Sequence, residues 1–413
     1  MAILPTPTGS ITNGAAPASS DRSGTTFQGI LLLIGSCLPV LGAVLLAPSL
    51  PNLMQVFAAT PGVAVLVPMI LTVPALMVAI VAPMAGAAAD KVGRKQVLLA
   101  AMIAYAVLGV APFFMDSLEA IVVTRVGVGI CEGFIMTCCT TLLGDYYSAQ
   151  RRNKYLSLQT VVTTISATVF LAAGGALGSL SWRAPFWLYA ISIVIAVPMM
   201  FVLWEPVKQP TKHLRQAVPW NQIIRPALVT LFGGIVFYTL VVHLSFLLAG
   251  QGLTDIGGIG LMAALASLAT AVGAFSFRAV GKFGPHRLMP AAFGLTAVGF
   301  IVIWFAGSVP AVMTGAVLAS AGAGLLLPTL LTWAVNLLAL EVRGTGTGIW
   351  TSALWIGQFL SPFIIAALGA AAGGMPAAVG ILGIAAGAAA VVSFFAPGKS
   401  ARTAAATSSV PVN

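Results

Sequence analysis

Residues 86–95 read GAAADKVGRK, a charged stretch that begins with a glycine and carries a second glycine at Gly93. It stands between two long apolar runs, near residues 62–85 and 97–115. Glycine permits tight turns and close approach of another backbone, and charged residues that flank an apolar run are typical of a membrane–water interface. The stretch therefore predicts a short polar hinge between two membrane-spanning helices.

The composition of the whole chain also indicates a membrane protein. Of its 413 residues, 59% are hydrophobic and only 7% are charged, whereas a soluble surface needs about a quarter or more charged residues. A helix needs about 20 apolar residues to cross the hydrocarbon core. The apolar runs have this length, and they lack the alternating ten-residue pattern of barrel strands. We therefore predict an all-α membrane protein.

Twelve apolar runs of helical length can be counted along the chain, which predicts twelve transmembrane helices. They lie near residues 28–50, 62–85, 97–115, 119–142, 156–178, 184–204, 226–249, 256–278, 288–306, 310–333, 345–368 and 376–396.

The basic residues give this count a test, because Lys and Arg are enriched in cytoplasmic loops. All but two of the 19 basic residues fall in alternate loops on one side. The exceptions are Arg125, inside a span, and Arg183, in a loop on the other side. The pattern predicts that both termini are cytoplasmic, in a cell membrane such as the bacterial inner membrane. It also accounts for the net charge of +10, so binding to nucleic acid is not expected.

The polar stretches suggest how the spans are grouped. The two ends of the chain are rich in small and polar residues, and the longest polar interval between spans contains three prolines. We expect a disordered tail at 1–27, a six-helix bundle at 28–205, a linker at 206–224, a second six-helix bundle at 225–397 and a tail at 398–413.

A shift of the chain by 191 residues tests whether the two halves repeat. Lys91 then falls on Lys282 and Gly93 on Gly284, in loops at equivalent points of each half. Asp90 falls on a glycine and Arg94 on a proline. The halves therefore repeat in topology, whereas the ionisable residues are concentrated in the first half.

The hinge resembles the signature loop of the major facilitator superfamily, Gly-x-x-x-Asp-(Arg/Lys)-x-Gly-Arg-(Arg/Lys), with Ala88 where a larger apolar residue is usual. The resemblance implies two pseudo-symmetric six-helix bundles around a central cavity that opens alternately to the two sides. It also implies a gate in which Asp90 contacts the start of the eleventh helix. The predicted gate comprises Gly86, Asp90, Gly93, Arg94, Asp145, Arg151, Arg152, Arg343 and Gly344.

The fourth span contains two charges, Arg125 and Glu132. A charge at the bilayer centre costs about 2.5–3.5 kcal/mol, and seven residues are nearly two helical turns, so both side chains should face a cavity or each other. The stretch RVGVGICEG resembles the second motif of the superfamily, which is associated with proton coupling. Its Glu is similar to that of organic-anion symporters and Spinster-type lysolipid carriers. Glu132 is the candidate for reversible protonation, and Arg125 either assists it, binds a carboxylate substrate, or forms a static pair with it.

Other polar residues in the spans are weaker candidates. His243 is either a second titratable group or a packed, hydrogen-bonded residue. The four cysteines lie inside predicted spans without the spacing of a zinc site, so neither a metal nor a cofactor is expected. The candidates for lining the cavity, which alternatively bridge helices or anchor them at the interface, are Gln159, Trp333, Trp355 and Gln358.

No nucleotide-binding or hydrolase motif occurs in the loops, so an enzyme is not expected. The glycine-rich end of the fifth span resembles that of drug:proton antiporters and arabinose-efflux-like permeases, although it lacks their proline. We expect proton-coupled export of small amphipathic or hydrophobic compounds by a monomer whose partners are its substrate, the proton and membrane lipids. The alternatives are proton-coupled uptake of an organic anion on Arg125, and a lipid scramblase or sensor that pumps nothing.

Overall fold

The structure is a computed structural model that describes residues 23–206, 220–338 and 342–395, apart from the side chains of Asn221 and Arg343 and the surroundings of Gly344. This part of the chain is helical and contains no strand. Twelve of its helical segments are long and apolar enough to cross a membrane, which confirms the predicted count. The predicted tails, and most of the predicted linker, lie outside the described residues.

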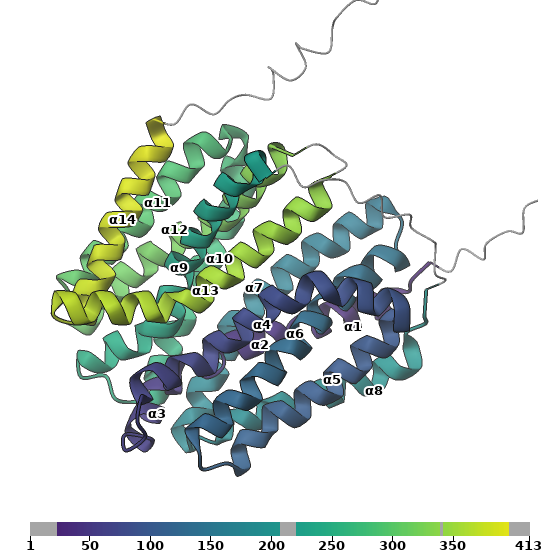
Figure 1. The fold of residues 1–413 in the computed structure, drawn as a ribbon, viewed down its shortest axis with the longest axis horizontal. Coiled ribbons are helices and arrows are strands. Elements are labelled where there is room, and N and C mark those ends of the chain that lie inside the picture. Colours follow the sequence, from purple (N-terminus) through teal and green to yellow (C-terminus); the bar gives the residue numbers. More distant parts are fainter. Residues whose placement is uncertain (1–22, 207–219, 339–341, 396–413) are drawn as a thin grey trace, which may run out of the picture.

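The first six spans form one group of packed helices and the last six form another (Figure 1). In the first group, the first span consists of α1 (Thr26–Gly35), α2 (Leu38–Val44), η1 (Ala47–Ser49) and α3 (Leu50–Val56). The rest are α4 (Val63–Val92), α5 (Arg94–Val110) with η2 (Ala111–Phe114), α6 (Leu118–Tyr146), α7 (Ala149–Leu180), and η3 (Ala184–Ala190) with α8 (Ile191–Val202).

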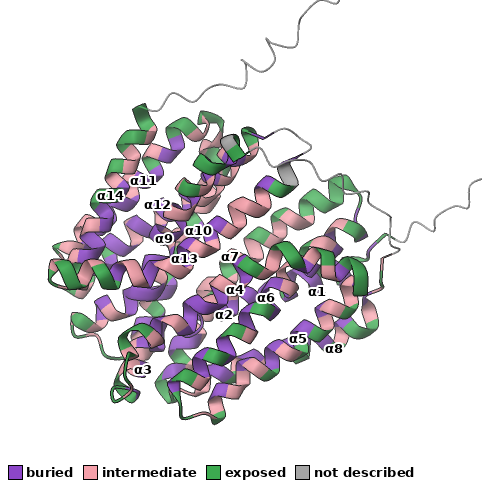
Figure 2. Cartoon of the chain, in the orientation of Figure 1, coloured by how far each residue is buried: buried purple, intermediate pink, exposed green. Residues whose placement is uncertain are grey.

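The second group contains α9 (Trp220–Gly250), α10 (Ile256–Val280), η4 (Gly281–Phe283), α11 (Pro285–Trp304), α12 (Val309–Asn336), α13 (Arg343–Ala372) and α14 (Met375–Phe395). Across the two groups, α7 packs along α10 and α4 packs along α13. Buried residues lie where helices face one another, as Figure 2 shows. Large apolar side chains such as Phe201 and Phe395 are exposed on outer surfaces, where lipid would cover them.

The first span differs from the continuous helix that its composition suggests. It extends to Val56, beyond the predicted end near residue 50, and it is interrupted on either side of α2. The cause is proline, which lacks an N–H and so removes a helical hydrogen bond. Pro39 stands in the first turn of α2, Pro48 in η1 and Pro51 in the first turn of α3.

The hinge at 86–95 is shorter than predicted. Helix α4 continues to Val92 and α5 begins at Arg94, so Gly93 alone separates them. Gly93 has φ +127° and ψ 131°, a conformation that is essentially restricted to glycine. Its counterpart in the second half, Gly284, has φ +77° between η4 and α11. The predicted turn by glycine is therefore present at both positions.

Two faces of the molecule must be distinguished. We call the face that carries Lys91, Arg94, Lys95, Arg151, Arg152, Lys154, Arg225, Arg278, Lys282 and Arg287 the basic face, and the other end of the spans the opposite face. The two groups of helices meet tightly near the opposite face, where a Cβ on Gly260 of α10 would lie 2.6 Å from the Cα of Gly175 in α7. Near the basic face, a Cβ on Gly86 would meet no atom within 4 Å. The structure is therefore closed at the opposite face.

Candidate functional site

A charge network lies on the basic face, and Arg94 is at its centre. Its guanidinium donates hydrogen bonds to Asp90 in the last turn of α4, with N···O distances of 2.8 and 3.1 Å, and it forms an ion pair with Asp145 near the end of α6. The backbone N–H groups of Arg94 and Lys95 donate to the carboxylate of Glu205, at 2.6 and 3.0 Å. The network therefore joins the ends of α4, α5 and α6 to the segment after α8.

Among the described residues, some members of the predicted gate contact one another and others do not. Asp145 pairs with Arg94, whereas Arg151 and Arg152 are exposed in the first turn of α7 and form no ion pair with any described residue. Asp90 is held by Arg94 one helical turn away. The structure does not describe the side chain of Arg343 or the surroundings of Gly344. The predicted contact between Asp90 and the start of the eleventh helix therefore stays a prediction. Gly86 has open space around it in this conformation.

Glu205 is not among the candidate site residues that the sequence identifies. It is an exposed acid that follows the sixth span, and nothing in its local pattern separates it from an ordinary interfacial charge. Its importance comes from the fold, because its carboxylate accepts hydrogen bonds from the first two N–H groups of α5. These groups have no partner inside the helix, and a negative charge at a helix N-terminus is stabilising.

The conformation of Gly93 leads to a testable prediction. Gly93→Ala forces a side chain into an unfavourable backbone region and to within 3.1 Å of the Glu205 carboxylate, so we expect it to destabilise the protein by about 1–3 kcal/mol. Gly86→Ala is the matched control, because its Cβ meets open space and alanine favours a helix. Thermal unfolding in detergent should show a lower midpoint for Gly93→Ala alone. Equal midpoints for both variants would contradict this account.

Glu132 lies in the middle of α6 and is fully buried. Neither of its carboxylate oxygens has a hydrogen-bond partner among the described residues. The carboxylate rests against the backbone of α2, where a Cβ on Gly42 would overlap it. The hydroxyl of Tyr105 lies close to the same point, and it donates to the carbonyl oxygen of Leu38 at 2.6 Å. Glu132 therefore contacts the first span at Gly42, whose lack of a side chain leaves room for the carboxylate.

Arg125 is buried elsewhere and does not pair with Glu132. Its guanidinium donates to the carbonyl oxygens of Leu108 and Gly109, at 3.0 and 3.3 Å, and it lies 5.0 Å from the ring centre of Tyr189. The carbonyl of Leu108 would normally bond to the N–H four residues later, but that residue is Pro112, which has none. Arg125 takes the place of this donor, so the static pair suggested by the seven-residue spacing is wrong.

A cavity lies between the two groups of helices. It is an open pocket of about 690 Å³, a volume that includes adjoining solvent, and it is lined by residues of α7, α9, α10 and α12 together with Val44 and Phe300. Its wall is apolar, with hydroxyl groups from Thr164, Ser267, Thr270 and Ser320, and no charged side chain lines it. The cavity suits a largely apolar molecule.

The remaining candidates do not line this cavity. Gln159 bridges helices, because its amide donates to Ser36 at 2.7 Å and to Thr140 at 3.1 Å. His243 is buried, with Nδ1 3.0 Å from the carbonyl oxygen of Thr239. Gln358 is buried in α13, while Trp333 packs against a core cluster in the second group and Trp355 is half-buried in α13. In this conformation Gln159 bridges helices, and the roles of the other four residues stay predictions.

Twelve helices long and apolar enough to span a membrane, in two packed groups with a cavity between them, fit the architecture of a membrane transporter. A model of the Major Facilitator Superfamily matches residues 32–282 and 253–412. The chain belongs to this family.

Two curated relatives match parts of the chain. The tetracycline resistance protein of class H from Pasteurella multocida is 26% identical over 222 residues, which are 54% of this chain and 55% of the relative. The quinolone resistance protein NorA of Staphylococcus aureus (strain MRSA252) is 25% identical over 177 residues, or 40% of this chain and 46% of the relative. The chain thus spans about half the length of these relatives.

Solved structures match over nearly the whole chain. The xylose transporter XylE from E. coli has a TM-score of 0.76 at 14% identity, covering 92% of this chain and 98% of that protein. A bacterial homolog of the human lysosomal transporter Spinster has a TM-score of 0.67 at 16% identity, covering 91% and 93%. At this identity the likeness establishes the fold alone.

Proposed function

We propose that the protein is a proton-coupled exporter of small amphipathic or hydrophobic compounds, which works by alternating access. The observation that carries the proposal is Glu132, a fully buried carboxyl group whose two oxygens have no partner among the described residues. Burying an ionised carboxylate without a partner is very unfavourable. The carboxyl is therefore expected to be neutral in this conformation and to reach water before it can lose its proton.

A change of conformation would supply this access. A group that is neutral in one state and ionised in another shifts the equilibrium between the two states by its difference in proton affinity. Glu132 lies against the interrupted first span, and the prolines of that span remove hydrogen bonds that would otherwise join its segments into one rigid helix. Proton binding and the exposure of the cavity would thereby be linked.

Export of apolar compounds is supported by two observations. The cavity has no charged side chain in its wall, and the relatives that match the chain are named for resistance to tetracycline and to quinolones. The basic face is assigned to the cytoplasm because Lys and Arg are retained on that side of membranes. We therefore place the protein in the cell membrane of a bacterium, with both termini in the cytoplasm.

The alternative of anion uptake has less support. It requires a cation that can meet a carboxylate in the cavity, but Arg125 is occupied by the carbonyl oxygens of α5 and by aromatic rings, and it does not line the cavity. Within the part of the chain that the structure describes, no specific contact favours a scramblase.

The test is accumulation of tetracycline and of norfloxacin by purified protein in liposomes. With an acidic lumen, we expect uptake above the external concentration, because protons leaving the lumen drive the compound inward. A protonophore should abolish the accumulation, and protein-free liposomes measure passive entry. Uptake that is equal with and without the pH gradient would contradict proton coupling.

A further inference from the structure

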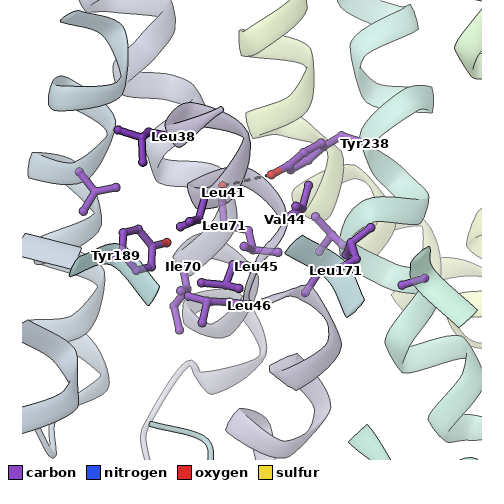
Figure 3. Packing of buried hydrophobic residues seen from close by; sticks show 14 of the residues in the cluster. Leu38, Leu41, Val44, Leu45, Leu46, Ile70, Leu71, Leu171, Tyr189 and Tyr238 are labelled. Atoms are coloured by element: carbon purple, nitrogen blue, oxygen red, sulfur yellow. Dashed lines mark hydrogen bonds between the residues drawn. The ribbon is translucent and has the colours of Figure 1, made fainter. Parts of the chain in front are cut away.

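Tyr238 forms a hydrogen bond that crosses between the two groups of helices. It lies in α9, and its side chain is almost completely buried. Its hydroxyl oxygen is 2.7 Å from the carbonyl oxygen of Ala43 in α2 and 3.3 Å from that of Leu71 in α4. Figure 3 shows the ring reaching from α9 toward the packed side chains of the first span. The second half thus bonds directly to α2.

The same short helix touches Glu132. Gly42, whose missing side chain leaves room for the Glu132 carboxylate, immediately precedes Ala43. Helix α2 has only seven residues, and turns separate it from α1 and η1. Prolines in its own first turn and in η1 remove helical hydrogen bonds on both sides of it. The segment is therefore joined to its neighbours by fewer backbone hydrogen bonds than a continuous helix has, and Glu132 contacts one of its residues while Tyr238 bonds to the next.

We propose that Tyr238 couples the protonation of Glu132 to the contact between the two halves, with α2 as the moving part. The proposal rests on the proposed function, and it assigns Tyr238 a positioning role. When Glu132 is neutral, α2 packs against it and the carbonyl of Ala43 accepts the Tyr238 hydroxyl, which holds the opposite face closed. An ionised Glu132 needs water, so α2 must move away, and the hydrogen bond across the halves breaks.

The groups around Glu132 are compatible with this role. The titratable groups that interact with it electrostatically are Tyr105 from α5, Tyr189 from η3, Tyr238 from α9, and Arg125 and Cys131 from α6 itself. Arg125 is the one cation in this set, and carbonyl oxygens and aromatic rings already surround it. This set contains no described Asp or Glu other than Glu132 itself.

The proposal can be tested by measuring a distance between the halves on the basic face. Spin labels on Lys154→Cys in α7 and Arg278→Cys in α10, both exposed, would be placed in a full-length background whose native cysteines are replaced by alanine. Distances would be recorded in lipid nanodiscs at about pH 5.5 and about pH 8.5, a range in which buried carboxyl groups titrate. In the otherwise unmodified protein, the long distance should dominate at low pH and decrease at high pH.

Tyr238→Phe removes only the hydroxyl. We expect the ratio of long to short distances at low pH to fall about fivefold, the effect of one net hydrogen bond, and to lose its dependence on pH. Glu132→Gln should give the same ratio of long to short distances at both pH values, because glutamine cannot lose a proton. Tyr146→Phe is the matched control, because it removes a buried hydroxyl bond to the carbonyl of Trp204 within the first half, and its pH dependence should be normal.

Two results would count against the proposal, and they differ in what they overturn. If Tyr238→Phe keeps the normal pH dependence while Glu132→Gln abolishes it, the role of Tyr238 is wrong and the proposed function stands. If neither the pH nor Glu132→Gln changes the distances, both the role of Tyr238 and proton coupling through Glu132 are wrong.

Discussion

Glu132→Gln should abolish accumulation driven by a pH gradient and leave exchange without a gradient intact. Glutamine has nearly the shape of the protonated acid but cannot lose a proton, so the variant should shuttle substrate without using the gradient. For one proton exchanged, accumulation can reach about tenfold per pH unit. We expect this value to fall to roughly onefold in the variant, as measured with radiolabelled tetracycline in proteoliposomes.

Glu119→Gln is the control for this experiment. Glu119 lies in the first turn of the same helix, but it is exposed and its carboxylate accepts a hydrogen bond from Ser117. This variant should accumulate substrate normally. If Glu132→Gln accumulates tetracycline to the same level as the unmodified protein, Glu132 is not the coupling acid.

The second large effect is expected at the contact between α7 and α10. Gly260 and Gly175 bring the two backbones together near the opposite face, and a Cβ on Gly260 would also lie 3.0 Å from the carbonyl oxygen of Leu171. Gly260→Val forces the helices apart. Overpacking typically costs about 1–3 kcal/mol, and here the cost falls on the state closed at the opposite face. We expect tetracycline exchange to fall by about tenfold to a hundredfold.

Gly294→Val separates this effect from a general effect of valine in a membrane helix. Gly294 lies in α11, and a Cβ there would meet no atom within 4 Å. Size-exclusion profiles should be normal for both variants, with transport reduced only in Gly260→Val. Normal exchange by well-folded Gly260→Val would show that closure at Gly175 and Gly260 is not required for transport.

The sequence was sufficient for the features that depend on composition and on neighbours along the chain. The twelve spans follow from runs of apolar residues, and the turn at Gly93 follows from a glycine between charged residues. The interrupted first span was not predicted, because hydropathy does not register the hydrogen bonds that Pro39, Pro48 and Pro51 remove.

The site was less predictable because its contacts join distant parts of the chain. Helical spacing suggested that Arg125 contacts Glu132. In the folded protein the guanidinium donates to the carbonyl oxygen of Leu108, which has no helical donor because Pro112 lacks an N–H. Asp145 lies close in the sequence to Arg151 and Arg152, whereas its partner in the folded protein, Arg94, is 51 residues away. Glu205 and Tyr238 carry no local signal, since their partners are 111 and 195 residues distant.

The central claim is that substrate and proton move in opposite directions through a cycle at Glu132. Coupling is reciprocal, so a substrate gradient should move protons even when no pH gradient is imposed. Proteoliposomes loaded with tetracycline and a fluorescent pH indicator, with the membrane potential clamped, would be diluted into buffer of equal pH. Antiport predicts that the lumen acidifies as tetracycline leaves, and that neither Glu132→Gln nor protein-free liposomes show this change. A lumen that becomes alkaline, or tetracycline exit with no change in pH beyond that of the controls, would contradict the account.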